Sequence, residues 1–159
     1  MKHIAHYNTP IGMMCMESDG TALTALYVDR SYAQYHEDSE DAIMKQAYQQ
    51  LMEYFDGKRK EFDVPIHLEG TDFQKKVWNA LCTIPYGSTC SYADIARKIG
   101  NPKAYRPVGG ANNKNPIMII VPCHRVIGAN GRIIGYGPGI DIKKKLINLE
   151  KQMQKQEQK

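Results

Sequence analysis

A run of five apolar residues that ends in a cluster of reactive side chains constrains the fold of this chain most. Residues 117–121 read Ile-Met-Ile-Ile-Val, and Pro122, Cys123, His124 and Arg125 follow directly. Consecutive apolar residues predict a strand covered on both faces, and a proline ends such a strand because it cannot donate to the sheet. The sequence therefore predicts a buried strand with a thiol at its end, beside potential cations that would stabilise a thiolate.

The neighbouring histidine is a candidate base for this thiol. Adjacent side chains of a strand point to opposite faces, so His124 can serve Cys123 only if the chain turns sharply or if a water links them. Glu150 is the acidic residue best placed by sequence to orient His124. The pair taken alone also fits a buried structural cysteine beside a surface histidine.

Charge is divided unequally along the chain. Residues 1–69 carry 6 Lys/Arg and 12 Asp/Glu, whereas residues 70–159 carry 15 Lys/Arg and 5 Asp/Glu, within an overall charge of +4. Such asymmetry predicts two modules, the basic one facing either a polyanion such as nucleic acid or only solvent.

Several classes of protein are excluded by composition. No apolar stretch approaches the roughly 20 residues that span a bilayer, and the N-terminus has no apolar segment typical of a secretory signal. We therefore expect a cytoplasmic protein, or a nuclear one in a eukaryote, with reduced thiols. The cysteines lack the spacing of a structural zinc site; they are Cys15, Cys82, Cys90 and Cys123.

The first half predicts a small α/β domain over residues 1–68. Turn residues separate three apolar segments, which predicts an antiparallel sheet, and apolar residues at a spacing of four predict one helix. The expected elements are strands at 3–7, 13–17 and 22–28, a loop at 29–38, and a helix from Ser39 to Phe55 with Asp41 in its first turn. His3, His6, His36 and His67 are interpreted as ordinary histidines rather than ligands.

The second half predicts short helices. Thr71 with Gln74, and Ser91 with Asp94, form two capping boxes, which open helices ending near Cys82 and Ile99. A further helix is expected from Ala104 or Tyr105 to Asn112, and the pair of short helices fits a helix-turn-helix.

The end of the chain predicts a turn, a loop and a last helix. An Asn-Gly turn between Val126-Ile127 and Ile133-Ile134 indicates a hairpin, and residues 135–139 form a glycine-rich loop. Asp141 is expected to cap a helix that ends near Glu150. Residues 151–159 are polar and are expected to be a frayed tail.

The segment from Ser91 to Glu150 strongly resembles the O6-alkylguanine-DNA alkyltransferases, also called methylated-DNA–protein-cysteine methyltransferases. The resemblance covers about 80 residues in order, back to the helix with Trp78. The matching elements are Ser91-Tyr92-Ala93-Asp94-Ile95-Ala96, Gly100-Asn101-Pro102-Lys103-Ala104, Arg106-Pro107-Val108-Gly109-Gly110-Ala111-Asn112, Asn115-Pro116, Ile120-Val121-Pro122-Cys123-His124-Arg125-Val126-Ile127-Gly128, Gly131, Gly135-Tyr136 and Leu149-Glu150.

This resemblance implies a fold and an activity. The N-terminal domain would be ribonuclease H-like, and residues 69–150 would form a mainly α-helical, winged helix-turn-helix-like domain with the active site. The protein would be a suicide methylated-DNA–[protein]-cysteine S-methyltransferase, which flips the alkylated base out of duplex DNA. The substrate would be O6-alkylguanine, and the resemblance leaves open whether O4-alkylthymine is a second substrate. It would act as a monomer, bind no membrane and need no metal or other cofactor.

The resemblance also implies roles for individual residues. Cys123 would accept the alkyl group, His124 would take its proton through a water, and Glu150 would hold the imidazole. Tyr92 would donate to the leaving guanine, and Asn115 would brace the turn before the active site. Arg106 would fill the gap left by the flipped base in a minor-groove complex. The other expected DNA contacts are Tyr105, Pro107, Gly109, Ala111, Asn112 and Arg125, and the expected pocket residues are Tyr136, Gly137, Val126 and Met118.

Three departures and three alternatives accompany this interpretation. Tyr105 and Pro107 stand where the family usually has small residues, Met118 stands where some relatives have proline, and the zinc ligands of some relatives have no equivalent. The alternatives are a non-catalytic module that binds alkylated DNA, a helix-turn-helix regulator, and a cysteine hydrolase. The presence of Cys123 argues against the first of these.

Overall fold

The computed structural model describes residues 2–29 and 38–157. The chain divides into two compact units, Met1–Glu69 and Gly70–Lys159, so the division lies one residue after the boundary expected from the sequence. None of the helices in the described ranges has the length and apolar character needed to cross a membrane.

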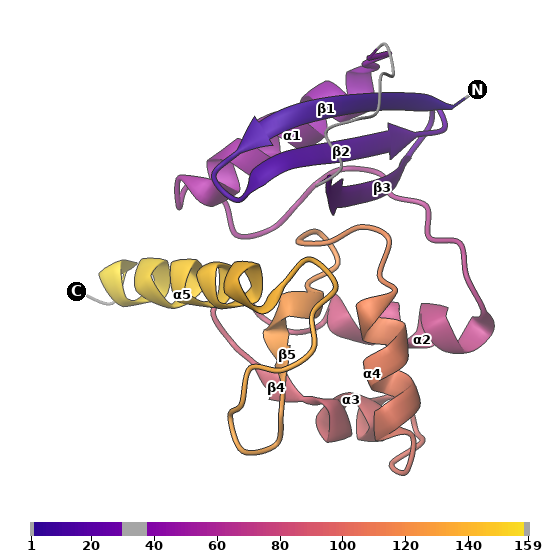
Figure 1. The fold of residues 1–159 in the computed structure, drawn as a ribbon, viewed down its shortest axis with the longest axis vertical. Coiled ribbons are helices and arrows are strands. Elements are labelled where there is room, and N and C mark those ends of the chain that lie inside the picture. Colours follow the sequence, from indigo (N-terminus) through magenta and orange to yellow (C-terminus); the bar gives the residue numbers. More distant parts are fainter. Residues whose placement is uncertain (1, 30–37, 158–159) are drawn as a thin grey trace. The chain divides into compact units, whose positions relative to one another are not determined.

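The first unit is a three-stranded antiparallel sheet with one helix against it (Figure 1). The strands are β1 (His3–Thr9), β2 (Gly12–Ser18) and β3 (Leu23–Val28), in that order across the sheet, and the helix is α1 (Ala42–Phe55). These elements confirm the three predicted strands and the helix. The predicted loop at 29–38 lies almost entirely outside the described residues.

Helix α1 begins later than the sequence predicts. Asp41 is the N-cap rather than a first-turn residue: its backbone is extended, and its carboxylate accepts a hydrogen bond of 2.9 Å from the amide of Met44. An aspartate side chain that accepts a hydrogen bond from a free amide in this way is the N-cap, so the helix starts at the next residue. Ser39 therefore precedes the helix, and its hydroxyl accepts a hydrogen bond from the amide of Ile4 in β1.

His6 of β1 lies between two carboxylates of the first unit. Its Nδ1 is 3.1 Å from Asp38 and its Nε2 is 3.1 Å from Asp29. The hydrogen bond to Asp38 raises the pKa of His6; burial opposes this, and Asp29 adds to it. Because the raised pKa belongs to the folded state, this stabilisation is complete below the unfolded pKa of about 6.5 and disappears as the pH rises through the folded pKa.

We therefore expect replacement of His6 by glutamine to destabilise the first unit at pH 5.5 and to have little effect at pH 8.5. The measurement is amide hydrogen exchange of β1 and β2 peptides in both proteins at each pH. Protection should fall by up to about fivefold at the lower pH, the scale of the roughly 0.2–1 kcal/mol that a partly exposed ion pair contributes. His67→Gln, at an exposed histidine, is the control. An equal loss of protection at both pH values would contradict the prediction.

The second unit is built on three packed helices: α2 (Asp72–Leu81), α3 (Tyr92–Lys98) and α4 (Tyr105–Asn113) (Figure 1). Both predicted capping boxes are present, at Thr71 and Ser91. Trp78 of α2 is 2% exposed, and its indole Nε1 donates to the carbonyl oxygen of Ala111 in α4 at 2.9 Å. The indole therefore fixes α4 against α2 by packing and by a hydrogen bond.

The predicted hairpin after the reactive cluster is wrong in its pairing. The turn itself forms, since the Gly128 amide donates to Arg132 at 2.7 Å, but residues 133–134 form no strand. Instead β5 (Val126–Ile127) pairs in parallel with β4 (Cys90–Ser91). This pairing places the start of α3 beside the segment that follows Cys123.

The last helix, α5, runs from Ile140 to Glu157, so the predicted frayed tail and the predicted end near Glu150 are wrong. Lysine, glutamine and methionine are good helix formers, and Gln154 packs against Gly87. The extra turns therefore have both propensity and a packing partner. Asp141 lies in the first turn of α5 rather than at its cap.

Candidate active site

The apolar run before the cysteine is buried except for the half-buried Ile120, but it is a tight turn and not a strand. The amide of Val121 donates to Ile117 at 3.0 Å, and the amide of Ile120 donates to Met118 at 2.8 Å. Ile119 has a φ of 72°, a left-handed conformation that is unusual for a β-branched residue. The predicted strand is wrong because a fully buried turn and a fully buried strand both consist of apolar residues. The pattern of apolar residues in the sequence does not distinguish the two.

Asn115 closes this turn with its side chain. Its Nδ2 donates to the carbonyl oxygen of Val121 at 2.7 Å, and its Oδ1 accepts from the amide of Ile117 at 3.0 Å. The turn leads into a short 3₁₀ helix, η1 (Cys123–Arg125). The chain therefore turns sharply at Cys123, which is one of the two conditions under which His124 can serve the thiol.

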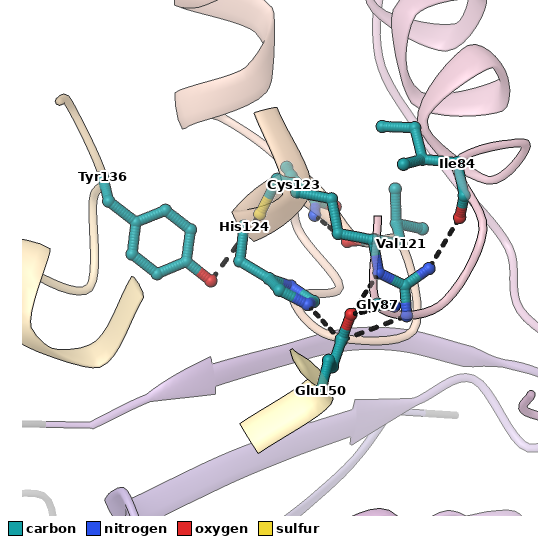
Figure 2. A network of polar contacts seen from close by, with 9 residues as sticks. Ile84, Gly87, Val121, Cys123, His124, Tyr136 and Glu150 are labelled. Atoms are coloured by element: carbon teal, nitrogen blue, oxygen red, sulfur yellow. Dashed lines mark hydrogen bonds and ion pairs between the residues drawn. The ribbon is translucent and has the colours of Figure 1, made fainter. Parts of the chain in front are cut away.

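Glu150 of α5 is the centre of a buried polar network (Figure 2). Its Oε2 lies 2.6 Å from Nε2 of His124, and its Oε1 accepts from Nε of Arg125 at 2.8 Å and from the amide of Gly87 at 3.1 Å. Burial alone raises the pKa of Glu150, but the hydrogen bonds and charges of His124 and Arg125 outweigh it and hold the pKa at about 2. Glu150 is therefore a carboxylate at neutral pH.

An ionised Glu150 determines which nitrogen of His124 carries the proton. A carboxylate only accepts hydrogen bonds, so Nε2 donates to it and Nδ1 holds the free lone pair. Nδ1 is buried and has no hydrogen-bond partner among the described residues. Burial lowers the pKa of His124, although Glu150 opposes the shift. His124 is therefore a neutral imidazole at pH 7, and its Nδ1 is free to accept a proton.

Cys123 is 3% exposed, and its thiol lies 3.8 Å from the hydroxyl oxygen of Tyr136 (Figure 2). Burial raises the pKa of Cys123, whereas hydrogen bonds with Asn115 and Tyr136 and the charge of Lys143 lower it. The thiol is therefore protonated at rest, and its reaction requires a base.

Tyr92 and the glycine-rich loop lie together beside this thiol. The hydroxyl of Tyr92 donates to the carbonyl oxygen of Ile134 at 3.1 Å. A side chain at Gly135, whose φ is 58°, would come within 3.9 Å of the Tyr92 hydroxyl oxygen. The loop and the start of α3 thus form adjacent walls, with Tyr136 from the same loop at the thiol.

Lys143 is a residue of the site that sequence reasoning missed. It is fully buried although it stands in the run Lys143-Lys144-Lys145, which is typical of an exposed face. A signal was present, because Lys143, Leu146, Ile147 and Glu150 follow the spacing of one helix face. All four are buried.

The residues predicted to contact DNA fall into two groups. Tyr105, Arg106 and Pro107 are exposed at the start of α4, and Gly109 is half-buried. Three others are buried, and their contact with DNA stays a prediction; they are Ala111, Asn112 and Arg125.

Each of these three has an internal task. The carbonyl oxygen of Ala111 accepts from Trp78, Nδ2 of Asn112 donates to the carbonyl oxygen of Cys123 at 3.3 Å, and Arg125 pairs with Glu150 and donates to Ile84 at 2.7 Å. They support the site from within.

The predicted pocket residues are close to Cys123 along the chain or in space. Met118 and Val126 are buried on the segments that precede and follow the cysteine, and Gly137 is exposed in the glycine-rich loop. Their contact with a substrate stays a prediction. Among residues 2–29 and 38–157, no group of three or more His, Cys, Asp or Glu side chains is arranged to hold a metal ion.

Comparisons with known proteins cover both units. Residues 2–68 match the 6-O-methylguanine DNA methyltransferase, ribonuclease-like domain, and residues 72–152 match the 6-O-methylguanine DNA methyltransferase, DNA binding domain. The methylated-DNA–protein-cysteine methyltransferase of Methanosarcina acetivorans is 49% identical over 157 residues, with 93% of this chain and 97% of the relative covered.

A relative of the same name in Mycobacterium tuberculosis is 49% identical, with 95% and 93% of the two chains covered. The crystal structure of Mycobacterium tuberculosis OGT in complex with DNA has a TM-score of 0.88 and 48% identity, and the match covers 95% of this chain and 94% of that chain. With both of its units matched and its length covered, the chain belongs to the 6-O-methylguanine DNA methyltransferase family.

Proposed function

We propose that the protein repairs duplex DNA by moving the alkyl group of O6-alkylguanine to its own Cys123. The observation that carries this proposal is the buried series Cys123, His124 and Glu150, in which a protonated thiol precedes a neutral imidazole that a carboxylate holds. A cysteine paired with a base in this way is an activated nucleophile.

The transfer is an in-line displacement in which atoms and charge balance. The thiol proton passes through a water to Nδ1 of His124, and the charge of Glu150 stabilises the imidazolium that results. The sulfur then forms a bond to the alkyl carbon, and the bond from that carbon to O6 breaks. Tyr92 gives its hydroxyl proton to the departing base, so that neutral guanine leaves, and the proton held by His124 returns through water to the Tyr92 oxygen. The thioether product has no easy route back to a thiol, and each molecule acts once.

Binding to DNA is proposed through the start of α4. This helix has no side-chain cap within the described part of the chain. We propose that the amides of Tyr105 and Arg106 bind a phosphate oxygen; Pro107 has no amide hydrogen. We propose that α4 lies in the minor groove and that Arg106 fills the gap in the stack after the damaged base flips out, which costs a few kcal/mol. We also propose that the protein works as a monomer in the compartment that holds the DNA.

The direct test is to find the alkyl group on the protein. The chain is mixed with a duplex that carries O6-methylguanine, digested with trypsin, and the peptide Asn115–Arg125 is weighed. A gain of one methyl group on Cys123, with loss of the lesion, is the expected result. An unmodified peptide beside intact O6-methylguanine would overturn the proposal. The non-catalytic, regulatory and hydrolase alternatives predict no methylated peptide, so the same measurement tests them.

Replacement of Arg106 by alanine should separate DNA handling from chemistry. We expect the transfer rate on duplex DNA to fall by about tenfold or more, because the flipped state loses the side chain that fills the stack. Transfer from free O6-methylguanine base should be unchanged, since no base has to be flipped. Lys151→Ala, which removes one exposed positive charge from α5, is the control. Equal losses of transfer rate in both variants would mean that Arg106 contributes only its positive charge to DNA binding.

A further inference from the structure

Lys143 is a buried cation to which the described acidic side chains offer no ion pair. Its side chain is fully buried, and no Asp or Glu among residues 2–29 and 38–156 lies within ion-pair distance of it. Burial of an unpaired ammonium is costly. The cost is offset in part by neutral acceptors, because Nζ donates to the carbonyl oxygens of Ile134 at 3.0 Å and Gly135 at 3.4 Å.

The same ammonium joins three segments that surround the thiol. From α5 it reaches the Tyr92 hydroxyl at 3.4 Å, and it lies 5.7 Å from the ring centroids of both Tyr92 and Tyr136. A cation is attracted to aromatic faces at this distance. Lys143 of α5 therefore holds the start of α3 and the glycine-rich loop together at one point, next to Cys123.

We propose that Lys143 is a positioning residue whose ammonium group holds the Gly135–Gly139 loop and Tyr92 in place, so that the alkyl-accepting pocket is complete only while this lysine is protonated. The charge performs this task better than a neutral amine because hydrogen bonds from a charged donor are stronger. The effect on transfer rests on the proposed function, whereas the effect on the loop does not.

Among the titratable groups around it, Lys143 is the group that changes charge just above neutral pH. Burial lowers its pKa to about 8, although the charge of an ionised Cys123 opposes the shift. Burial raises the pKa of Tyr92 and of Cys123 and lowers that of His124, so these three are uncharged at pH 8. Tyr136 faces the ammonium from the loop.

The first arm of the test needs no substrate. Lysine side chains labelled with ¹³C at Cε are titrated by NMR, and Lys143→Met identifies the resonance of Lys143. We expect this resonance to titrate near pH 8, and the backbone amides of Gly135 and Gly137 to shift with the same midpoint. Loop amides that do not follow the lysine would overturn the proposal, whether or not the protein transfers alkyl groups.

The second arm measures single-turnover transfer from O6-methylguanine duplex between pH 6 and 10. The wild-type rate should fall by about tenfold per pH unit above the midpoint found by NMR. In Lys143→Arg this fall should move above pH 10, because a guanidinium stays protonated. In Lys143→Met the rate should be low throughout, with no fall near pH 8. Lys144→Met, at the exposed neighbouring position, should keep the wild-type profile.

The outcomes of the two arms are distinct. A wild-type fall that persists unchanged in Lys143→Met, or no fall at all in the wild type, would overturn the proposal. Circular dichroism over the same pH range identifies a variant that does not fold, and the wild-type titration then decides. Absence of methyl transfer in the wild type, with loop amides that follow Lys143, would refute the proposed function and leave the positioning role standing.

Discussion

Replacement of Cys123 by serine is expected to abolish alkyl transfer, with a loss of at least about 10⁴-fold in rate, the scale seen when an enzyme loses its nucleophile. A hydroxyl is a far weaker nucleophile than a thiol and is not ionised by a neutral imidazole of lowered pKa. The measurement is the fraction of O6-methylguanine that remains in a duplex after incubation with excess protein.

The other cysteines provide the matched controls. Cys82 is exposed, Cys15 is buried in the first unit, and burial raises the pKa of Cys90 to about 11. Serine at each of these positions should leave one methyl group accepted per molecule. Cys123→Ser should also bind duplex DNA as the wild type does, because its side chain is buried. Residual transfer in Cys123→Ser would show that a second cysteine is an acceptor.

Replacement of Glu150 by glutamine is expected to reduce both stability and activity. The second unit should lose about 3–5 kcal/mol in free energy of unfolding, because a buried guanidinium is left without its carboxylate. The transfer rate should fall by about a hundredfold or more, since a neutral amide cannot stabilise the imidazolium form of His124. Urea unfolding and single-turnover transfer measure the two losses.

A second substitution separates these two effects. Arg125→Met combined with Glu150→Gln removes both charges of the buried pair, and such replacements are often neutral for stability. We expect the double variant to recover most of the lost free energy and none of the lost rate. Recovery of both would contradict the assignment of Glu150 to His124, because it would make the carboxylate a structural partner of Arg125 alone.

Acid should weaken the same network. The folded pKa of Glu150 is about 2 and its ordinary value is 4.5. The stabilisation is therefore present above pH 4.5 and is lost as the pH falls through 2. The difference in free energy of unfolding between the wild type and Glu150→Gln should accordingly shrink between pH 5 and pH 2.

The elements that depend on local signals could be predicted from the sequence. The boxes at Thr71 and Ser91 fixed the starts of α2 and α3, because one side chain satisfies the free amides at each helix start. Cys123, His124 and Glu150 could be chosen as a group because their residue types suit one another. Their proximity in space follows from the length and phase of α5.

The errors have one physical source, which is that tertiary packing overrides local patterns. Turn 117–121 looks like a strand because its closure depends on the side chain of Asn115 and on a left-handed Ile119, neither of which alters the apolar pattern. The internal pairing of Arg125 with Glu150 depends in the same way on where α5 packs. The burial of Lys143 depends on how α5 packs against Tyr92 and the carbonyl oxygens of Ile134 and Gly135, which a run of three lysines does not indicate.

The contact between Trp78 and Ala111 has a practical consequence. The chain has one tryptophan, and it lies in the second unit, hydrogen-bonded to the helix that carries Arg106. Intrinsic fluorescence excited at the indole thus comes from the unit with the active site and is silent for the other. Unlabelled protein can therefore report unfolding of that unit, or displacement of α4 by a duplex, through the colour and intensity of its own emission.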